Sequence, residues 1–354
     1  MTVTHSTSSS LGFGLVGLGM VADFHAQALA HVSGGRLVGV ATRDAAKGRA
    51  FAEKHGVAFA GTSIDELVAR PDIDAVCITT SSGVHLDPAL VAIRAGKHVI
   101  IEKPLDITTE RADEILRAAE AKGVRVASIF QGRFGEGART VKAAVAAGRL
   151  GRMVLASAYV KWHRTAQYYT GTRGTLAADG GGVLMAQGIH AIDLLQWFAG
   201  LPVEVFCRMT RRVYTGIEAE DTASATLTFA DGALGAIEAS TALWPGWQRR
   251  IELCGEHGSI ALEDDRITRW DFRTAQPGDD AIRAAKDTAA LGSGASAPNA
   301  ISFVGHQRQL QDFIDALREN RPLAIDGREA RKAVALIRAL YDSAARGLPV
   351  KLST

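Results

Sequence analysis

Short apolar runs alternate with amphipathic stretches over the first third of the chain. The apolar runs have the length of buried strands and occur at 13–16, 37–41, 57–60, 75–79, 98–101 and 124–129. The stretches between them repeat their apolar residues at helical spacing, most clearly at 44–55, 63–69 and 108–122. Strands that alternate with helices form βαβ units, so this region predicts a parallel, doubly wound sheet with right-handed crossovers.

Local signals mark the ends of these helices. Ser63 and Glu66 have the spacing of a capping box at a helix start. Gly56, Gly96 and Gly123 stand at expected helix ends, where a left-handed residue commonly follows the last turn. These signals agree with the hydrophobic pattern and support the alternation of strands and helices.

The pattern changes after about residue 150. Strand-like runs now follow one another with short turns between them, at 153–163, 203–213, 222–229, 233–240, 248–254 and 258–262. Asp231-Gly232 is a hairpin signal, and a long helix pattern at 183–198 interrupts the strands. This second half therefore predicts an α+β domain with a large, open and mainly antiparallel sheet.

A chain of 354 residues is long enough for two domains. The change of pattern predicts a disordered leader at 1–10, a Rossmann-type domain at 11–133 and an α+β domain at 134–354. Residues 273–300 are rich in Ala, Gly, Asp and Ser and predict a loop, a lid or a poorly ordered segment. Two later helix patterns, at 302–319 and 327–346, precede the strand-like LPVKL and are candidates to pack back on the first domain.

Composition excludes several classes of protein. The chain is 47% hydrophobic and 22% charged, with a net charge of +2 from interspersed acids and bases, so we expect no nucleic-acid partner. The apolar runs are too short for a membrane span, and the polar start lacks the apolar core of a secretory signal. The three cysteines are widely spaced, and Cys77 lies in an apolar run as a buried free thiol would. We therefore expect a cytoplasmic protein.

A glycine-rich turn follows the first predicted strand. Gly17, Gly19 and Ala22 match GxGxx[G/A], and a helix pattern opens at the same point with Met20 and Val21 in its first turn. Gly17 permits the tight turn, Gly19 lets backbone approach a pyrophosphate, and Ala22 lets the helix pack on the strand. The helix N-terminus then faces the anion. Strand, turn and helix together predict a dinucleotide-binding site.

The end of the second strand bears on the choice of cofactor. An acid commonly stands there to bind the ribose of NAD, but this strand ends in Thr42-Arg43-Asp44. Arg43 could pair with a 2′-phosphate or only stack on adenine as a solvated loop residue, and Asp44 stands where a helix N-cap belongs. The residues favour NADP over NAD and leave both open.

Other polar residues follow the carboxyl ends of the fourth and fifth strands, which face the cofactor in a doubly wound sheet. Thr79 and Thr80 follow the fourth strand, and His85 either contacts the ribose or has a structural role. Glu102 and Lys103 precede a rigid proline after the fifth strand. Lysine carries three donors on one charge, which suits fixing a hydroxyl or polarising a carbonyl.

A second cluster begins at a run of three glycines and continues to Gln187, His190 and Asp193. At 100° per residue, Ala186, His190, Asp193 and Trp197 share one stripe of the helix. A lone histidine on an apolar helix is commonly a core residue, but the glycines permit close backbone approach. His190 is the best candidate for a general acid or base, because its ordinary pKa lies near neutrality.

Residues 159–169 mix aromatic and polar side chains in the way that sugar sites do. Trp162 could stack on a pyranose, while Arg164 and Tyr168 could bond hydroxyls or a carboxylate; packing at a sheet edge is the alternative. Gln131, after the last strand of the first domain, is a further candidate for substrate contact. We assign no metal, since His163 has no ligand partner at useful spacing.

At this point the chain resembles a known family. Gly17-x-Gly19-x-x-Ala22, Glu102-Lys103-Pro104, the GGG…GxHxxD run and the HxxQLxDF segment at His306–Phe313 resemble the Gfo/Idh/MocA oxidoreductases over nearly the whole chain. The resemblance implies a Rossmann domain, a second domain whose open sheet often mediates oligomerisation, and NAD(P)-linked interconversion of alcohols and ketones on sugars or cyclitols. A homodimer or homotetramer is then expected.

The resemblance also assigns roles to two residues. Lys103 matches the lysine that fixes the reacting hydroxyl, and His190 matches the catalytic histidine. Ala186 is a departure, because many members have Asp or Asn four residues before this histidine. Asp193, Gln187 or Asp179 could orient His190 instead, or it could act with Lys103 alone.

The sequence thus predicts hydride transfer between NAD(P) and a secondary alcohol or ketone of a sugar, glycoside, nucleotide sugar or cyclitol. The runner-up is a regulator of the same fold that binds NAD(P) without catalysis, which the loss of an acid at Ala186 favours. Retention of Lys103 and His190 argues for the enzyme. Reduction of an imine or a dihydrodiol-type substrate is a third possibility on the same fold.

Overall fold

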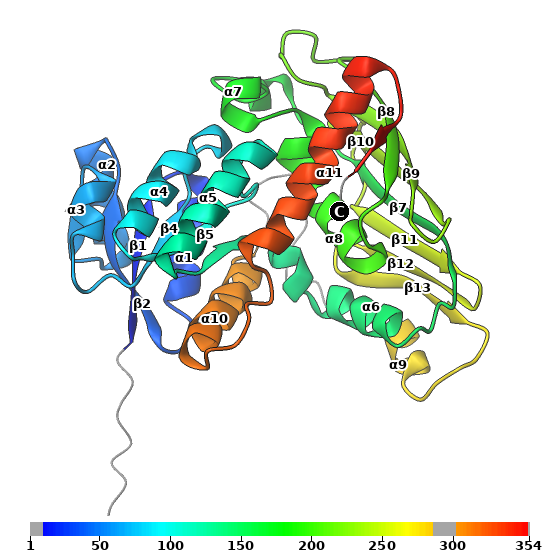
Figure 1. The fold of residues 1–354 in the computed structure, drawn as a ribbon, viewed down its shortest axis with the longest axis horizontal. Coiled ribbons are helices and arrows are strands. Elements are labelled where there is room, and N and C mark those ends of the chain that lie inside the picture. Colours follow the sequence, from blue (N-terminus) through cyan, green and yellow to red (C-terminus); the bar gives the residue numbers. More distant parts are fainter. Residues whose placement is uncertain (1–9, 286–301, 353–354) are drawn as a thin grey trace, which may run out of the picture.

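A computed structural model describes residues 10–285 and 302–352 of the chain. The leader predicted at 1–10 lies outside the described residues except for residue 10. Of the loop predicted at 273–300, residues 286–300 lie outside the described residues, and the described part contains a short helix at Asp279–Ala284. Two sheets, one on each side of a layer of helices, make up the described part (Figure 1).

The first sheet has six parallel strands in the order β3-β2-β1-β4-β5-β6. Its strands are β1 (Leu11–Val16), β2 (Gly35–Ala41), β3 (Phe59–Gly61), β4 (Ala75–Ile78), β5 (His98–Ile101) and β6 (Val126–Ser128). The strand order reverses between β1 and β4, which places a ligand crevice outside the carboxyl ends of these strands. The predicted Rossmann sheet is confirmed.

Helices connect these strands where the hydrophobic pattern predicted them. They are α1 (Met20–Leu29), α2 (Ala45–His55), α3 (Ile64–Val68), α4 (Leu86–Arg94) and α5 (Thr109–Lys122). Asp44 and Ser63 cap the starts of α2 and α3, and Gly56 and Gly123 end α2 and α5 in the left-handed conformation. The local start and stop signals therefore set these helix boundaries.

The second sheet has eight strands in the order β13-β12-β11-β7-β10-β9-β8-β14. Its strands are β7 (Met153–Lys161), β8 (Glu204–Thr210), β9 (Thr222–Thr228), β10 (Leu234–Ser240), β11 (Arg250–Gly255), β12 (Gly258–Glu263), β13 (Arg266–Phe272) and β14 (Val350–Lys351). Only β7 and β10 pair in parallel, so the sheet is mixed and mainly antiparallel, as predicted.

Helices cover one face of this sheet. Helices α6 (Glu136–Ala146), α8 (Ile189–Ala199) and α11 (Gly327–Arg346) lie between it and the Rossmann sheet (Figure 1). Helices α7 (Leu176–Asp179) and α9 (Asp279–Ala284) lie at its ends. Among the described residues no element covers the opposite face, so the sheet is open on that side.

Helix α10 (Val304–Arg318) belongs by sequence to the end of the chain but packs against α1. Leu310, Phe313 and Ile314 complete the apolar core on that face of the Rossmann sheet. Gln309 accepts a hydrogen bond from the backbone N–H of Phe130 at 3.0 Å and donates one to the carbonyl of Ser128 at 2.8 Å. These contacts fix α10 to the end of β6.

The structure contains elements that the hydrophobic pattern did not predict. Helices α6 and α9 and edge strand β13 are new, and β13 exposes most of its side chains, which hides the alternation of a half-buried strand. A π-helical turn (Leu184–Gly188) precedes α8, so regular α-helical spacing does not hold between Ala186 and His190. None of the described helices combines the length and the apolar character of a membrane-spanning segment.

Candidate active site

The glycine-rich turn lies at the switch point of the Rossmann sheet. Gly17 has a φ of +87°, and a Cβ at this position would lie 2.8 Å from the backbone N of Thr80, so only glycine fits. The hydroxyl of Thr79 donates to the carbonyls of Val16 and Gly17, which joins the turn to the end of β4. Thr79 and Thr80 therefore pack against the turn and hold its conformation.

Gly19 differs from Gly17 in what surrounds it. Its φ of −80° is ordinary, and a Cβ added there would meet nothing within 4 Å. No side chain caps helix α1, Met20 is 44% exposed, and Val21 is half-buried, so the first turn of the helix faces open space. Ala22 is fully buried against the sheet. A bare helix N-terminus beside open glycine backbone fits the pyrophosphate of a dinucleotide.

The end of β2 presents a base rather than an acid. Asp44 accepts hydrogen bonds from the backbone N–H groups of Ala46 and Lys47 at 3.0 Å, so its carboxylate caps α2. Arg43 is exposed, and Thr42 is half-buried and donates its backbone N–H to Gly61. Arg43 is therefore the available charged side chain at this position.

Lys103 extends from the end of β5 to the π-helical turn of the second domain. Its Nζ donates to the carbonyl of Ala186 at 2.8 Å. Burial lowers the pKa of the Lys103 ammonium and the nearby Glu102 carboxylate opposes this shift, while Arg173 adds to it. The backbone of residue 186 thus anchors the lysine, and the loss of an acidic side chain at this position does not remove a partner for Lys103.

His190 lies in the first turn of α8, just after the π-helical turn. Burial is the main cause that holds the pKa of His190 well below its usual range, and the positive charges of Lys103 and Arg249 add to it. The imidazole is therefore neutral at neutral pH. Phe130 packs against the ring edge to face, with centroids 6.1 Å apart. Within residues 10–285 and 302–352 no side chain or carbonyl forms a hydrogen bond with the ring, which leaves its nitrogens available to a ligand.

The candidates for orienting His190 are bound elsewhere. Asp193 forms a bidentate ion pair with Arg133 at 2.6 and 2.7 Å. Gln187 donates to the Tyr168 hydroxyl at 2.6 Å, and Asp179 accepts the backbone N–H of Gly174 at 2.8 Å. Helix α8 and the Phe130 ring therefore set the orientation of His190.

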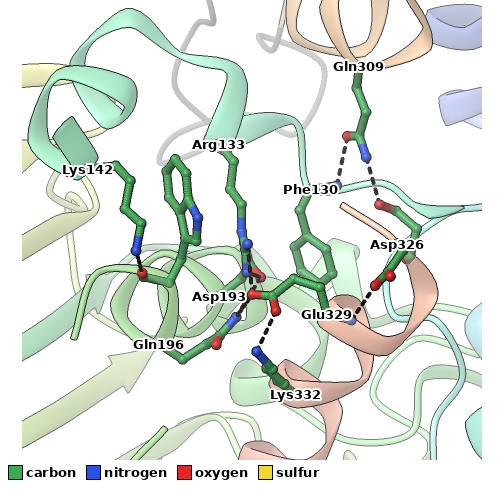
Figure 2. A network of polar contacts seen from close by, with 11 residues as sticks. Phe130, Arg133, Lys142, Asp193, Gln196, Gln309, Asp326, Glu329 and Lys332 are labelled. Atoms are coloured by element: carbon green, nitrogen blue, oxygen red, sulfur yellow. Dashed lines mark hydrogen bonds and ion pairs between the residues drawn. The ribbon is translucent and has the colours of Figure 1, made fainter. Parts of the chain in front are cut away.

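The Arg133–Asp193 pair is the centre of a buried polar network (Figure 2). Arg133 also donates to Glu329 of α11 at 2.9 Å, and Gln196 donates to both carboxylates. Arg133 lies in the short 3₁₀ helix η2 (Gln131–Phe134) that follows the last Rossmann strand. The network therefore joins the helix that carries His190 to both η2 and α11.

Comparison with known proteins agrees with this geometry. Residues 11–130 match the model described as "Oxidoreductase family, NAD-binding Rossmann fold", and residues 138–261 match the "GFO/IDH/MocA C-terminal domain". The chain belongs to the Gfo/Idh/MocA oxidoreductase family. The resemblance seen in its motifs is confirmed, and the chain is an NAD(P)-dependent dehydrogenase that acts on CH–OH groups.

Individual relatives of this Gfo/Idh/MocA protein are dehydrogenases and reductases. The WlbA dehydrogenase from Bordetella pertussis, solved with NADH and UDP-GlcNAcA, is 30% identical over 98% of this chain and 99% of its own, with a TM-score of 0.87. The 1,5-anhydro-D-fructose reductase of Ensifer adhaerens is 34% identical over 52% of this chain and 55% of its own. Inositol 2-dehydrogenase of Rhizobium meliloti is 26% identical over 96% and 99%.

The remaining residues predicted to bind substrate lie in different surroundings. Tyr168 accepts hydrogen bonds from Gln187 and from Arg173, whose guanidinium also lies over its ring. The Oε1 of Gln131 is buried and has no hydrogen-bond partner among the described residues. An unsatisfied buried acceptor beside His190's helix fits a site completed by a ligand.

Trp162 and Arg164 are more enclosed than a stacking platform requires. Trp162 is 7% exposed and packs in the core of the second domain. The Arg164 guanidinium lies 4.9 Å from the centroid of the Trp162 ring and also contacts Tyr168. Stacking of Trp162 on a sugar stays a prediction, and the observed contacts fit packing as well.

His85 has a structural position. It is the N-cap residue of α4 rather than its first turn, and it is fully buried. Its ring nitrogens face the carbonyls of Pro104 at 2.9 Å and Thr80 at 3.1 Å. His85 thus ties the loop after Lys103 to the end of β4, and contact with a ribose stays a prediction.

Two arginines near the reacting groups had no signal in the sequence. Arg249 lowers the pKa of His190, and the Nε of Arg249 is buried without a hydrogen-bond partner among the described residues. Arg173 lowers the pKa of both Lys103 and Arg164. Each lies in a polar segment with no recognisable motif, so only the folded chain shows that they approach the site.

Proposed function

We propose that this enzyme transfers a hydride between the nicotinamide of NAD(P) and a carbon that bears a secondary hydroxyl on a sugar-like substrate. The observation that carries the proposal is the contact between Lys103 Nζ and the Ala186 carbonyl. It brings the lysine of the Rossmann domain to the helical segment that carries His190, at the carboxyl edge of the sheet. Two proton-handling groups then lie beside the expected place of the nicotinamide.

His190 and Lys103 have complementary roles in this mechanism. The neutral imidazole of His190 accepts the proton of the substrate hydroxyl. The ammonium of Lys103 stabilises the negative charge that develops on the same oxygen. When bound, the nicotinamide cofactor supplies the hydride acceptor. In the reverse direction both side chains donate hydrogen bonds to a ketone.

A surplus of positive charge around the reacting groups favours an anionic sugar. Arg173 lowers the pKa of Lys103, and Lys103 and Arg249 lower the pKa of His190, while the carboxylates of Glu102 and Asp179 act in the opposite sense. Three cationic side chains and two acidic ones thus act on the proposed site. The WlbA relative binds UDP-GlcNAcA, which carries both a pyrophosphate and a carboxylate. We therefore place nucleotide-linked sugars first among the substrate candidates, before neutral glycosides and cyclitols.

Replacing Lys103 by alanine tests the mechanism. We expect turnover to fall at least about a hundredfold, because the developing oxyanion loses its cationic partner. Affinity for NAD(P)H should stay nearly unchanged, since the glycine-rich turn is intact. Steady-state absorbance of NAD(P)H with a panel of nucleotide sugars, glycosides and inositols measures turnover, and fluorescence titration measures cofactor affinity.

The matched control is Lys122→Ala at the exposed end of α5, which should change neither quantity. Full turnover in the Lys103→Ala enzyme would refute its role. Cofactor binding without turnover of any substrate in the panel would instead support the alternative function, a regulator that binds NAD(P) without catalysis.

We propose NADP as the preferred cofactor, because Arg43 is exposed while Asp44 is engaged as a helix cap. The WlbA relative was solved with NADH, so both cofactors must be compared directly. Arg43→Ala should raise KM for NADP about tenfold, the value of one charged hydrogen bond, and leave KM for NAD nearly unchanged. Arg49→Ala, on the exposed face of α2, is the control. An equal effect on both cofactors would contradict the proposal.

We also propose that the enzyme is a homodimer or homotetramer that associates through the open face of its eight-stranded sheet. Leu155 of β7 and Leu234 of β10 are cross-strand neighbours there and are about half exposed. Apolar side chains paired on two inner strands of an uncovered sheet support an interface between copies of the chain.

A further inference from the structure

Glu102 precedes the catalytic lysine, but its side chain is enclosed by the protein. It is 5% exposed, and its Oε1 lies 2.9 Å from Nε2 of His25 and 3.2 Å from Nε2 of His306. Its Oε2 accepts the backbone N–H of Lys103 at 3.2 Å. The carboxylate therefore has donors on both oxygens, one of which belongs to the peptide that carries the lysine.

The two histidines come from distant parts of the chain. His25 lies in α1, whose N-terminus faces the expected pyrophosphate, and His306 lies in α10 at the other end of the sequence. Their rings pack edge to face with centroids 5.3 Å apart, and Phe24 packs on His306. Both are almost fully buried, so the three side chains hold one another in a fixed arrangement.

The arrangement favours an ionised Glu102 carboxylate beside a neutral His25 ring. Burial lowers the pKa of His25, so its ring stays neutral. Burial alone would raise the pKa of Glu102, but hydrogen bonds from His25 and His306 outweigh burial and hold that pKa well below its usual range. A carboxylate that accepts several hydrogen bonds behaves in this way. One negative charge is thus retained inside the domain.

The same three side chains have the composition of a metal site, since their ligand atoms lie within 4.8 Å of one another. Metal-binding histidines normally donate their second ring N–H to an acceptor, which fixes the ring. Here Nδ1 of both His25 and His306 is buried and lacks a partner among the described residues. An unprotonated Nδ1 with Nε2–H facing Glu102 explains this better than a metal ligand would.

We propose that His25, Glu102 and His306 form a positioning triad, in which two buried imidazoles hold a buried carboxylate that fixes the Lys103 backbone and keeps the Lys103 ammonium charged. The proposal rests on the proposed function, because it assigns the charge to the service of Lys103.

The charges around the triad all bear on this role. The groups that face Glu102 from the packed elements are His25 of α1, Cys77 of β4, His85 at the start of α4, His190 of α8, His306 of α10 and Lys103 itself. Arg173 and Asp179 act on Lys103 with opposite signs. Glu102 is therefore the adjacent acid that offsets the burial of Lys103.

The first test reads the histidines directly and needs no substrate. Nitrogen-15 NMR of the imidazoles in the full-length protein, assigned with His25→Gln and His306→Gln, reports tautomer and charge. We expect each ring to carry its proton on Nε2, which faces Glu102, and none on Nδ1, which has no partner among the described residues. A protonated ring, an Nδ1–H tautomer or a metal-shifted signal in the protein as purified would overturn the triad.

The second test reads Lys103 through its chemistry. The rate at which acetic anhydride acylates Lys103, followed by mass spectrometry against pH, gives the midpoint at which the amine loses its proton. Glu102→Gln removes the negative charge and keeps the side-chain shape, so the midpoint should move down by about one pH unit. An unchanged midpoint in a folded Glu102→Gln protein would refute the role of the carboxylate.

Two further variants separate charge from general structure. Asp279→Asn removes another buried carboxylate, which pairs with Arg149 beside edge strand β13, and should leave the midpoint in place. Glu102→Asp keeps the charge but shortens its reach, so turnover should fall while the midpoint stays near the wild-type value. If the wild-type protein turns over no substrate, the proposed function fails, yet the NMR and acylation results still decide the triad.

Discussion

At the scale of single residues, the glycine-rich turn contains two glycines that the protein needs for different physical reasons. Gly17 has a positive φ and lies against the backbone of Thr80, so the fold itself requires it. Gly19 has an ordinary φ and open space on its Cβ side, so the fold would accept a side chain. The proposed function supplies the reason for glycine at position 19, because a side chain there would stand in the way of the expected pyrophosphate.

This difference predicts that substitution by alanine affects stability at position 17 and cofactor binding at position 19. Gly17→Ala should lower the melting temperature and the yield of folded protein, because the new Cβ would lie 2.7 Å from Thr80 Cγ2. Gly19→Ala should keep the wild-type melting temperature but weaken NAD(P)H binding about tenfold or more, which fluorescence titration measures. Gly216→Ala, another open and exposed glycine, should affect neither. A stable Gly17→Ala enzyme with normal cofactor affinity would contradict this account.

At the scale of elements, the position of helix α8 decides whether His190 can act. The helix begins after a π-helical turn whose backbone is held by Glu220, which accepts the N–H groups of Gly182 at 3.0 Å and Leu184 at 2.9 Å. One turn after His190, the buried pair of Asp193 and Arg133 joins the helix to η2. Both ends of the segment are thus fixed by buried carboxylates.

Breaking the buried pair should therefore be costly. Arg133→Met leaves the Asp193 carboxylate buried without its cation and should lower the free energy of unfolding by about 3 kcal/mol or more. The double variant Arg133→Met, Asp193→Leu should recover most of that loss, since no buried charge remains unpaired. Arg328→Met breaks the exposed pair with Glu120 and should cost at most about 1 kcal/mol. Urea denaturation compares the four proteins, and equal losses for the buried and exposed pairs would contradict the network's importance.

At the scale of the whole molecule, the two proposed reacting side chains belong to segments that pack on different sheets, and the two sheets share one layer of helices. Lys103 ends a strand of the first sheet, whereas His190 lies on a helix that covers the second (Figure 1). Helix α10 returns to the Rossmann sheet and brings His306 to Glu102. The proposed site therefore depends on how the two parts are joined, while no described element covers the opposite face of the second sheet.

Charge placed on that open face should separate the subunits. Leu234→Glu would bury a carboxylate in the proposed interface, so light scattering after gel filtration should show a smaller mass than wild type. Leu348→Glu, which is equally exposed but lies beyond α11, should leave the mass unchanged. A monomeric wild-type protein would refute the proposed interface.

The sequence by itself determined the features that depend on local spacing. The strand–turn–helix at Gly17, the cap at Asp44 and the change from alternating to consecutive strands follow from neighbouring residues, and the structure has them. The motifs around Lys103 and His190 also sufficed to recognise the family. Edge strand β13 and helix α9 were missed because exposed, charged segments carry little periodic signal.

Only the tertiary structure decided which side chains meet across long separations. Asp193, a candidate to orient His190, pairs with Arg133 instead, and Lys103 donates a hydrogen bond to the backbone carbonyl of Ala186. His25, Glu102 and His306 become neighbours only when the two ends of the chain pack on one sheet. Spacing along a sequence fixes directions within one helix or strand, whereas contacts between elements depend on how their buried faces pack together.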